Sequence, residues 1–308
     1  MMKFLVVGPG AMGCLFAARL KMAGHDVVLL DCIQQNADII NKNGLRIEDL
    51  SCDFFSHVPA VLSASKQSPD VALICVKSYD TRQAAEDIRP WLNPEAAVLT
   101  LQNGLGNVEI LEDVFGRANV LGGVTAEGAT LLGPGHVRHA GEGETVIGPE
   151  KTRHGLIRDI VNAFNSAGFR TRSAENVDDL IWGKLVINVG INALAALTGL
   201  RNGTLPTLSG TISIMEEAVS EAVAVAHKKG INLPYASAIE RVLEVCRSTS
   251  GNIASMLQDV MNKRTTEIEA INGAIVREGK DMGIATPVNA TLARLVSAVQ
   301  ETYRECLR

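Results

Sequence analysis

The sequence predicts an α/β domain with a doubly wound parallel sheet, followed by an all-helical domain. As far as about residue 173, short apolar runs that suit buried strands alternate with stretches of helical periodicity. From about residue 176 onward the periodicity is helical, with glycine and proline between the helices. The 308 residues are enough for two domains of roughly 150 residues each. We place the domains at residues 1–174 and 175–308.

The opening of the chain predicts strand, turn, helix and strand. An apolar run at residues 4–7 meets three glycines, a helical stretch follows, and a second apolar run at 27–30 stops at Asp31. This G-x-G-x-x-G spacing is typical of dinucleotide-binding folds, in which the three glycines serve the turn, the approach to the pyrophosphate and the packing of helix on strand. The phosphates then lie at the helix N-terminus. We therefore assign cofactor binding to Gly8, Gly10, Ala11, Met12 and Gly13.

The remaining elements follow the same signals. In the first domain the patterns predict strands over 45–47, 52–57, 71–77 and 120–126, a strand running into a glycine loop over 97–107, and helices over 34–43, 81–91 and 155–167. Alternating apolar positions around the turn at 133–135, continuing to Val146 and Ile147, predict a hairpin. In the second domain we expect helices over 177–197, 211–229, 235–246, 253–262, 265–282 and 288–306.

Composition argues against several classes of protein. The formal net charge is −5 and no basic tail occurs, so nucleic acid is not an expected partner. The six cysteines include no CxxC, which favours reduced thiols over disulfides or a zinc ribbon. We see neither a signal peptide nor a run of about 18 apolar residues, so we expect a cytoplasmic protein without a membrane span. His136 and His139 lack a third ligand nearby, and no metal site is expected.

Asp31 stands at the end of the second predicted strand. A carboxylate there can accept hydrogen bonds from the adenosine ribose hydroxyls of NAD, and it would repel a 2′-phosphate. No arginine lies beside it, and the next basic residue is Lys42. The sequence therefore favours NAD(H) at this position. The alternative is a turn or capping aspartate with no role in binding.

Two polar residues follow apolar strands of the predicted sheet. Lys77 comes after the run that begins at Val71, and Asn103 comes after the next strand along the chain. Ligands bind at the carboxyl ends of parallel strands, so both side chains are candidates for contact with the cofactor. A surface lysine and a turn Asn-Gly are the structural alternatives.

Lys184, Asn188 and Asn192 recur every four residues on an otherwise apolar predicted helix, and we call them the polar stripe. A solvent-facing stripe is one explanation. Asparagine is a poor helix former, which favours a stripe that lines a cleft between the domains. Lysine suits a general acid, because burial lowers its pKa towards working pH.

Three further polar residues of the helical domain are weaker candidates. Ser255, with Asn252 nearby, can bind a carboxylate, although a capping or surface serine is the simpler explanation. Glu267 is predicted at the start of a helix, where the helix dipole favours an acid even without a role in a site.

Taken together, these motifs resemble the ketopantoate reductase (2-dehydropantoate 2-reductase) family over nearly the whole chain. The matching segments are GPGAMG (8–13), VKSYDT (76–81), LQNGLGN (101–107), GKLVINVGINALAALTG (183–199), NIASMLQD (252–259) and RTTEIEAINGAIV (264–276). The resemblance implies a Rossmann domain followed by a helical domain like the C-terminal domain of 6-phosphogluconate dehydrogenase. It also implies NADPH-dependent reduction of 2-dehydropantoate to (R)-pantoate, in the route to pantothenate and coenzyme A.

The resemblance assigns roles to matching residues. Lys184 would be the general acid that protonates the oxygen formed when hydride reaches the keto carbon. Glu267 would hydrogen-bond the resulting hydroxyl and help to set the position and charge of the lysine. Asn188 and Asn192 would hold the far hydroxyl of the substrate, and Ser255 with Asn252 would bind its carboxylate. Asn103 and Lys77 would lie on the nicotinamide side of the cofactor.

Several alternatives remain open from the sequence. The family implies NADP(H), whereas Asp31 locally favours NAD(H). A reductase of another 2-keto acid would share the same fold, since a fold does not fix a function. A non-catalytic protein that senses dinucleotides belongs to a different class, and it would not need Lys184 and Glu267. The apolar helical domain also suits a homodimer.

Overall fold

The computed structural model of the protein describes residues 1–65, 68–149 and 154–303. Its contacts divide the chain into two units. Unit 1 consists of Met1–Gln102 and Asn107–Val177, and unit 2 consists of Asn103–Gly106 and Asp178–Arg308. The helical unit therefore includes four residues from the first half of the chain. Cys306, at the end of the last predicted helix, lies outside the described residues.

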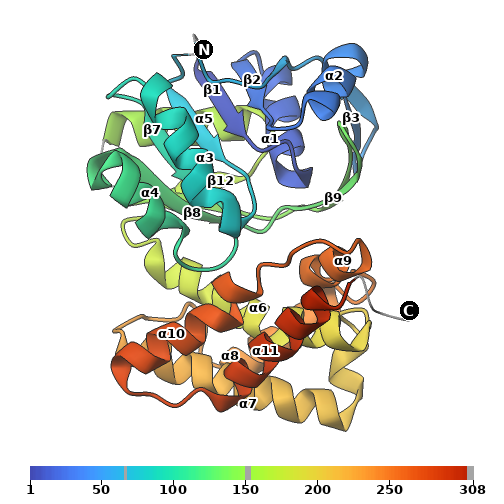
Figure 1. Cartoon of the computed structure of the whole chain (residues 1–308). Helices are drawn as coiled ribbons and strands as arrows, with labels where there is room; N and C mark the ends of the chain where they lie inside the picture. The colour runs from blue at the N-terminus through green and yellow to red at the C-terminus, as the bar shows by residue number, and fades with distance from the viewer. Residues whose placement is uncertain (66–67, 150–153, 304–308) are drawn as a thin grey trace. The chain divides into compact units, whose positions relative to one another are not determined.

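Unit 1 is built on an eight-stranded sheet (Figure 1). Neighbouring strands run parallel, except that β8 and β11 pair antiparallel. Parallel neighbours need crossover connections, which helices supply, and the result is the doubly wound fold that the sequence predicts. In spatial order the strands are β12 (Thr171–Ser173), β11 (Thr145–Gly148), β8 (Val120–Thr125), β7 (Ala97–Thr100), β6 (Val71–Ile74), β1 (Lys3–Val7), β2 (Asp26–Leu30) and β5 (Ala60–Val61).

The two faces of this sheet pack against different helices. On β1, Phe4 and Val6 belong to the core that contains α1 (Ala11–Met22) and α5 (His154–Ser166). Leu5 and Val7 belong to a second core with α3 (Thr81–Ile88) and α4 (Asn107–Phe115). Because successive side chains of a strand point to opposite faces, a strand covered on both sides is apolar throughout. This explains the uninterrupted apolar runs of β6 and β7.

A second sheet of four strands completes unit 1, in the order β4 (Phe54–Ser56), β3 (Leu45–Glu48), β10 (His136–Gly141) and β9 (Gly128–Gly133). Strands β9 and β10 form the predicted hairpin around Gly135. The prediction that Val146 and Ile147 continue this hairpin is wrong. They lie in β11 of the large sheet, where they pair with β8 and β12. Both are buried, and their apolar pattern fits either sheet.

The helix α2 (Gln34–Asn43) has the predicted bounds. It ends at Gly44, whose φ of +73° is a conformation that favours glycine.

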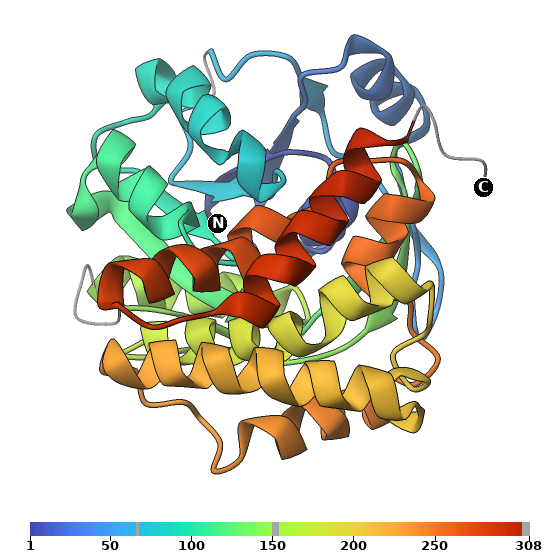
Figure 2. The same cartoon turned by 60° about the horizontal axis from the view of Figure 1, so that its bottom comes forward.

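Unit 2 is helical and is organised around α6 (Figure 2). Helices α7, α8, α9 and α11 all pack against α6, and its buried residues face several directions. A helix that is apolar on most sides is typical of a core position. The α-helices of the unit are α6 (Asp178–Thr198), α7 (Ser209–Lys228), α8 (Ala238–Ser248), α9 (Ser255–Met261), α10 (Asn272–Met282) and α11 (Pro287–Glu301).

The length and composition of α6 would suffice to cross a membrane, which is true of no other helix in the described part of the chain. In its most apolar window, 67% of the residues are buried inside the protein. Core helices pass the same test of length and hydropathy, so this observation is weak evidence for a span.

The predicted helix over 265–282 is interrupted. A 3₁₀ turn, η5 (Ile268–Ala270), comes first, and α10 begins only after Ile271, whose backbone angles are not helical. The Thr266 hydroxyl accepts a hydrogen bond from the backbone N–H of Ile268 at 3.3 Å, a local bond that competes with helix formation. Glu267 therefore precedes a 3₁₀ turn, whereas the sequence places it at the start of an α-helix.

Candidate functional site

At two positions of the turn between β1 and α1, only glycine fits. Gly8 has a φ of +99°, and a Cβ on it would lie 2.9 Å from the backbone nitrogen of Val76. A Cβ on Gly13 would collide with the carbonyl oxygen of Gly8. At Gly10 the nearest atom to a Cβ would be the Cys75 carbonyl oxygen, at 4.0 Å. Packing thus requires Gly8 and Gly13, whereas Gly10 leaves space at the start of the helix.

That space suits an anion. Gly10 is the N-cap of α1 and has no side chain that could cap the helix. The first turn of the helix carries no acidic residue. Ala11 and Met12 are the first helical residues, and both are partly exposed. Backbone N–H groups at a helix start and the helix dipole both favour a phosphate. The turn therefore fits the pyrophosphate of a dinucleotide.

Asp31 follows β2 and is only 6% exposed. One carboxylate oxygen, Oδ1, accepts a hydrogen bond from the backbone N–H of Ile33 at 3.0 Å, so the turn role that the sequence left open is present. The other oxygen, Oδ2, is buried without a hydrogen-bond partner. A buried polar atom without a partner calls for an explanation, and a ribose hydroxyl would supply the missing donor.

Lys77 follows β6, the strand next to β1, and so lies at the same edge of the sheet as the glycine turn. The loops at this edge are joined by Gln102. Its Nε2 donates to the Val76 carbonyl at 2.7 Å and to the Thr81 hydroxyl at 2.9 Å. The Thr81 hydroxyl in turn donates to Asn107. Sequence reasoning missed this role of Gln102, because one glutamine after a strand has no distinctive pattern.

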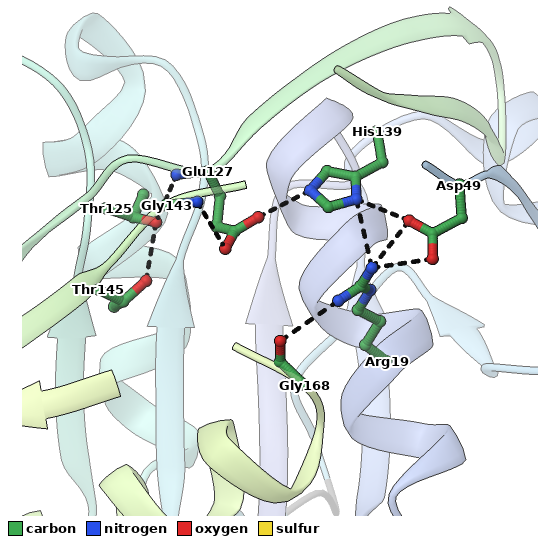
Figure 3. A network of polar contacts seen from close by, with 8 residues as sticks. All are labelled: Arg19, Asp49, Thr125, Glu127, His139, Gly143, Thr145 and Gly168. Carbon is green, nitrogen blue, oxygen red and sulfur yellow. Dashed lines mark hydrogen bonds and ion pairs between the residues drawn. The ribbon is translucent and has the colours of Figure 1, made fainter. Parts of the chain in front are cut away.

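Elsewhere in unit 1, a buried charged network anchors α1 to the four-stranded sheet (Figure 3). The His139 ring lies 2.6 Å from Asp49 through Nδ1 and 2.7 Å from Glu127 through Nε2. Arg19, on α1, contacts Asp49 at 2.8 Å. Burial alone would lower the pKa of His139, but hydrogen bonds to Glu127 and Asp49 outweigh it and raise that pKa above 6.5. A protonated His139 can donate to both carboxylates, which gives this histidine a structural role.

In unit 2 the charges of Lys184 and Glu267 interact. Burial lowers the pKa of Lys184 from 10.5 to about 8, and the charge of Glu267 opposes that shift. Glu267 is 8% exposed. Lys184 and Asn188 of the polar stripe are partly exposed, and Asn192 is buried. A lysine that is easily deprotonated and paired with a carboxylate is suited to proton transfer.

Ser255 is the first residue of α9, the helix that packs against α6. Ala254 is the N-cap of that helix, so Ser255 does not have the capping role that the sequence left open. Asn252 and Ser255 are both exposed. The carbonyl of Asn252 accepts a hydrogen bond from the backbone of Asn202 at 3.1 Å, which fixes the loop before α9.

The segment Asn103–Gly106 joins the helical unit at η5, directly after Glu267. The backbone N–H of Leu105 donates to the Ala270 carbonyl at 2.9 Å. A Cβ on Gly104 would lie 2.5 Å from that carbonyl oxygen, so only glycine allows this approach. Asn103 thus belongs to the same unit as Lys184 and Glu267. It lies in the Asn-Gly turn that the sequence analysis gave as the structural alternative to cofactor contact.

Two family models match the chain. One, described as "Ketopantoate reductase PanE/ApbA", matches residues 4–151, and its C-terminal counterpart matches residues 176–300. A 2-dehydropantoate 2-reductase of Halobacterium salinarum is 36% identical over 304 residues, which cover 97% of this chain and 99% of the relative. One from Pyrococcus horikoshii is 34% identical over 298 residues, which cover 96% of this chain and 97% of the relative.

Solved structures agree with these matches. A ketopantoate reductase of the PanE/ApbA family from Ralstonia eutropha JMP134 superposes with a TM-score of 0.92 at 35% identity, covering 99% of this chain and 100% of the other. The structure of D-mandelate dehydrogenase with NADH and anilino(oxo)acetate gives a TM-score of 0.89 at 29% identity, covering 98% of this chain and 99% of the other.

Proposed function

Because the chain belongs to the ketopantoate reductase (PanE/ApbA) family, we propose that it reduces 2-dehydropantoate to (R)-pantoate with NAD(P)H, in the synthesis of pantothenate. Family membership also favours an enzyme over a protein that only senses dinucleotides. The observation that carries the proposed mechanism is the position of Lys184, where burial lowers the lysine pKa to about 8 and the charge of Glu267 opposes that shift.

Lys184 is the general acid in this proposal. The bound nicotinamide cofactor supplies the hydride to the keto carbon. As negative charge builds on the carbonyl oxygen, the ammonium group of Lys184 stabilises it and then donates a proton from Nζ. A pKa of about 8 keeps the lysine mostly protonated at neutral pH and still lets the proton leave readily. Glu267 favours the charged form of the lysine and accepts a hydrogen bond from the product hydroxyl.

The other candidates bind rather than transfer protons. Asn188 and Asn192 hold the distal hydroxyl of the substrate, and Ser255 with Asn252 binds its carboxylate. Asn103 and Lys77 contact the nicotinamide side of the cofactor, and the glycine turn, with Ala11 and Met12, holds its pyrophosphate through backbone N–H groups. These assignments follow the family motifs at matching positions of this sequence.

The activity is tested with purified protein, 2-dehydropantoate and both reduced cofactors. We expect turnover of 2-dehydropantoate with a kcat/KM at least about tenfold above that for other branched 2-keto acids, because the proposed polar residues would bind its hydroxyl and carboxylate. A protein that binds the cofactor and leaves 2-dehydropantoate unreduced would eliminate this function.

We propose that NADH is the preferred cofactor. The orphan oxygen of Asp31 would accept from the ribose hydroxyls and would repel a 2′-phosphate. The similar D-mandelate dehydrogenase was solved with NADH, which supports this preference. Steady-state kinetics with both cofactors test it, and Asp31→Asn, which keeps the shape and removes the charge, should improve NADPH relative to NADH. A wild-type kcat/KM for NADPH at least about tenfold above that for NADH would contradict the argument.

The similarity to D-mandelate dehydrogenase supports a second candidate substrate class. The D-mandelate dehydrogenase structure contains anilino(oxo)acetate, and the chain resembles that protein nearly as well as the ketopantoate reductase. Reduction of an aryl 2-keto acid is therefore the alternative. Assaying the keto acid that corresponds to mandelate beside 2-dehydropantoate decides between them, and a higher kcat/KM for the aryl acid would favour the alternative.

We also propose a cytoplasmic homodimer. In the helical unit Leu208 is 45% and Leu295 is 49% exposed, and association of two copies would cover such side chains. Sedimentation equilibrium at micromolar concentration tests this, and a mass near 32.8 kDa would show a monomer.

A further inference from the structure

Two asparagines, Asn272 and Asn289, are completely buried in the helical unit, with 0% exposure each. Burying an amide is unfavourable unless hydrogen bonds replace those it makes with water. One amide oxygen, Oδ1 of Asn272, is buried without a partner. A leucine of similar size would occupy the same space without this cost. The pair is therefore poorly explained by stability alone.

The first asparagine connects α10 to the helix of the polar stripe. Asn272 begins α10, and its Nδ2 donates to Oδ1 of Asn289 at 2.9 Å. The same nitrogen lies 3.5 Å from the carbonyl oxygen of Val189, which directly follows Asn188 on α6. The start of α10 is thus held against α6 within the stretch that carries the polar stripe.

The second asparagine fixes the start of α11. The Nδ2 of Asn289 donates to the Ala218 carbonyl at 2.9 Å and to the Glu221 carboxylate at 2.8 Å, both on α7. That carboxylate also accepts from the backbone N–H groups of Val288 and Asn289, at 2.8 and 3.0 Å. An acid that accepts from the first N–H groups of a helix fixes that helix end in place.

The other end of α11 reaches the turn that carries Glu267. Near the end of α11, Oε1 of Gln300 accepts a hydrogen bond from the backbone N–H of Thr266 at 2.5 Å. Thr266 precedes Glu267, and Asn272 lies five residues after it. The Glu267 turn is therefore held on one side through α11 and on the other through α10, and both connections meet at Asn289.

We propose that Asn272 and Asn289 are positioning residues that hold the Glu267 turn in a fixed place relative to Lys184 on α6. The inference rests on the proposed roles of Lys184 and Glu267. Neither asparagine takes part in the proton transfer. They act through the backbone of α10 and α11, so that the carboxylate stays where its charge acts on the lysine.

The double variant Asn272→Leu/Asn289→Leu tests the proposal. Replacing both partners by apolar side chains of similar size leaves neither amide of the pair unsatisfied, and the Glu221 carboxylate keeps its two backbone donors, which favours retention of the fold. Lys184 is titrated in two ways. One is the basic limb of the kcat/KM profile with 2-dehydropantoate. The other is the pH dependence of its carbamylation by cyanate, measured by mass spectrometry without substrate or cofactor, since only the neutral amine reacts.

Loss of the fixed geometry weakens the effect of Glu267, so both titrations should move to lower pH by about half a unit or more. The kcat should fall about fivefold or more, with the KM for the keto acid within about twofold, because the ground-state contacts remain. Asn272→Ser, whose side chain is too short to bridge to Asn289, should shift both titrations in the same direction and provides a second variant if the double variant fails to fold.

Thr211→Val is the matched control. Thr211 is 8% exposed in the same unit, and its hydroxyl donates to the Leu208 carbonyl at 2.9 Å. This variant should lower the melting temperature and leave the titration of Lys184 unchanged. If the asparagine variants do the same, the pair serves stability only and the proposal is overturned. A wild-type protein that does not reduce 2-dehydropantoate would reject the proposed function, while the cyanate titration would still decide the positioning role.

Discussion

The two units present their candidate residues by opposite means. In unit 1 the glycine turn works through missing side chains, because a Cβ on Gly8 or Gly13 would strike the backbone. In unit 2 the candidate residues are polar side chains, several of them on an apolar helix, and burial lowers the pKa of Lys184. The comparison teaches that a glycine turn is defined by a few neighbouring residues, whereas the acidity of a buried lysine depends on the packing of a whole unit.

The largest effect should come from the polar side chains of unit 2. We expect Lys184→Ala to lower kcat about 10²- to 10⁴-fold, because the general acid is lost. Steady-state kinetics at pH 7 measure this, with the melting temperature as a check on folding. Lys229→Ala is the control, since that lysine is an exposed residue of the same unit paired with Glu278. A kcat of Lys184→Ala within about tenfold of wild type would show that the lysine is not the acid.

The glycine turn of unit 1 is tested by two substitutions. Gly13→Ala should weaken cofactor binding about tenfold or more and lower the melting temperature, because the new Cβ collides with the Gly8 carbonyl oxygen. Gly10→Ala has room for its Cβ, so it should keep the melting temperature and weaken only the binding of the dinucleotide. Titration of cofactor fluorescence and thermal unfolding separate the two effects. Equal melting temperatures for both variants would contradict the packing argument.

The pH profile links burial in unit 2 to activity. As the proposed general acid, Lys184 would have to be protonated for reduction, so kcat/KM should fall as pH rises above about 8, the lowered pKa of that lysine. Glu267 raises this pKa, so Glu267→Gln should move the fall to lower pH. Measurements from pH 6 to about 10 test both statements. A profile that stays flat through pH 9, or a shift of the variant to higher pH, would be inconsistent with this pairing.

The smallest effect concerns the charged network of unit 1. Hydrogen bonds to two carboxylates raise the pKa of His139, so its contribution to stability is full below about pH 6.5 and is lost as pH rises through the folded-state pKa. The melting temperature should therefore fall by a few degrees between pH 6 and 9, and less in His139→Gln. Parallel pH curves for the two proteins would show that His139 does not titrate in this way.

Much of unit 1 could be predicted from sequence, because its signals are short-range. The bounds of α2 and its end at Gly44 follow from local periodicity and one glycine. The placement of Val146 and Ile147 could not be predicted in this way, because two apolar residues fit any buried strand and only the tertiary pairing selects β8. The resemblance to the family, which rested on motifs along the whole chain, is confirmed.

The candidate site was predictable to a similar extent. The polar stripe on α6 follows from spacing, but its lowered lysine pKa follows from burial that no local pattern reports. The interruption before α10 was missed, since Thr266 competes for hydrogen bonds within a segment whose apolar periodicity is helical. Gln102 and Asn272 were missed for a common reason: their partners are distant in sequence.

The composition of unit 2 has a consequence for recombining this protein with its relatives. Four of its residues, Asn103–Gly106, precede Asp178 by more than seventy positions, and Leu105 is hydrogen-bonded to Ala270. A chimaera with a single crossover at Val177 would combine a loop from one parent with the docking surface of another. Exchanging the helical unit intact takes two inserts, the long C-terminal one and a short one that carries Gly104. In this protein the structural unit that must be exchanged as a whole is not encoded by one continuous stretch of the gene.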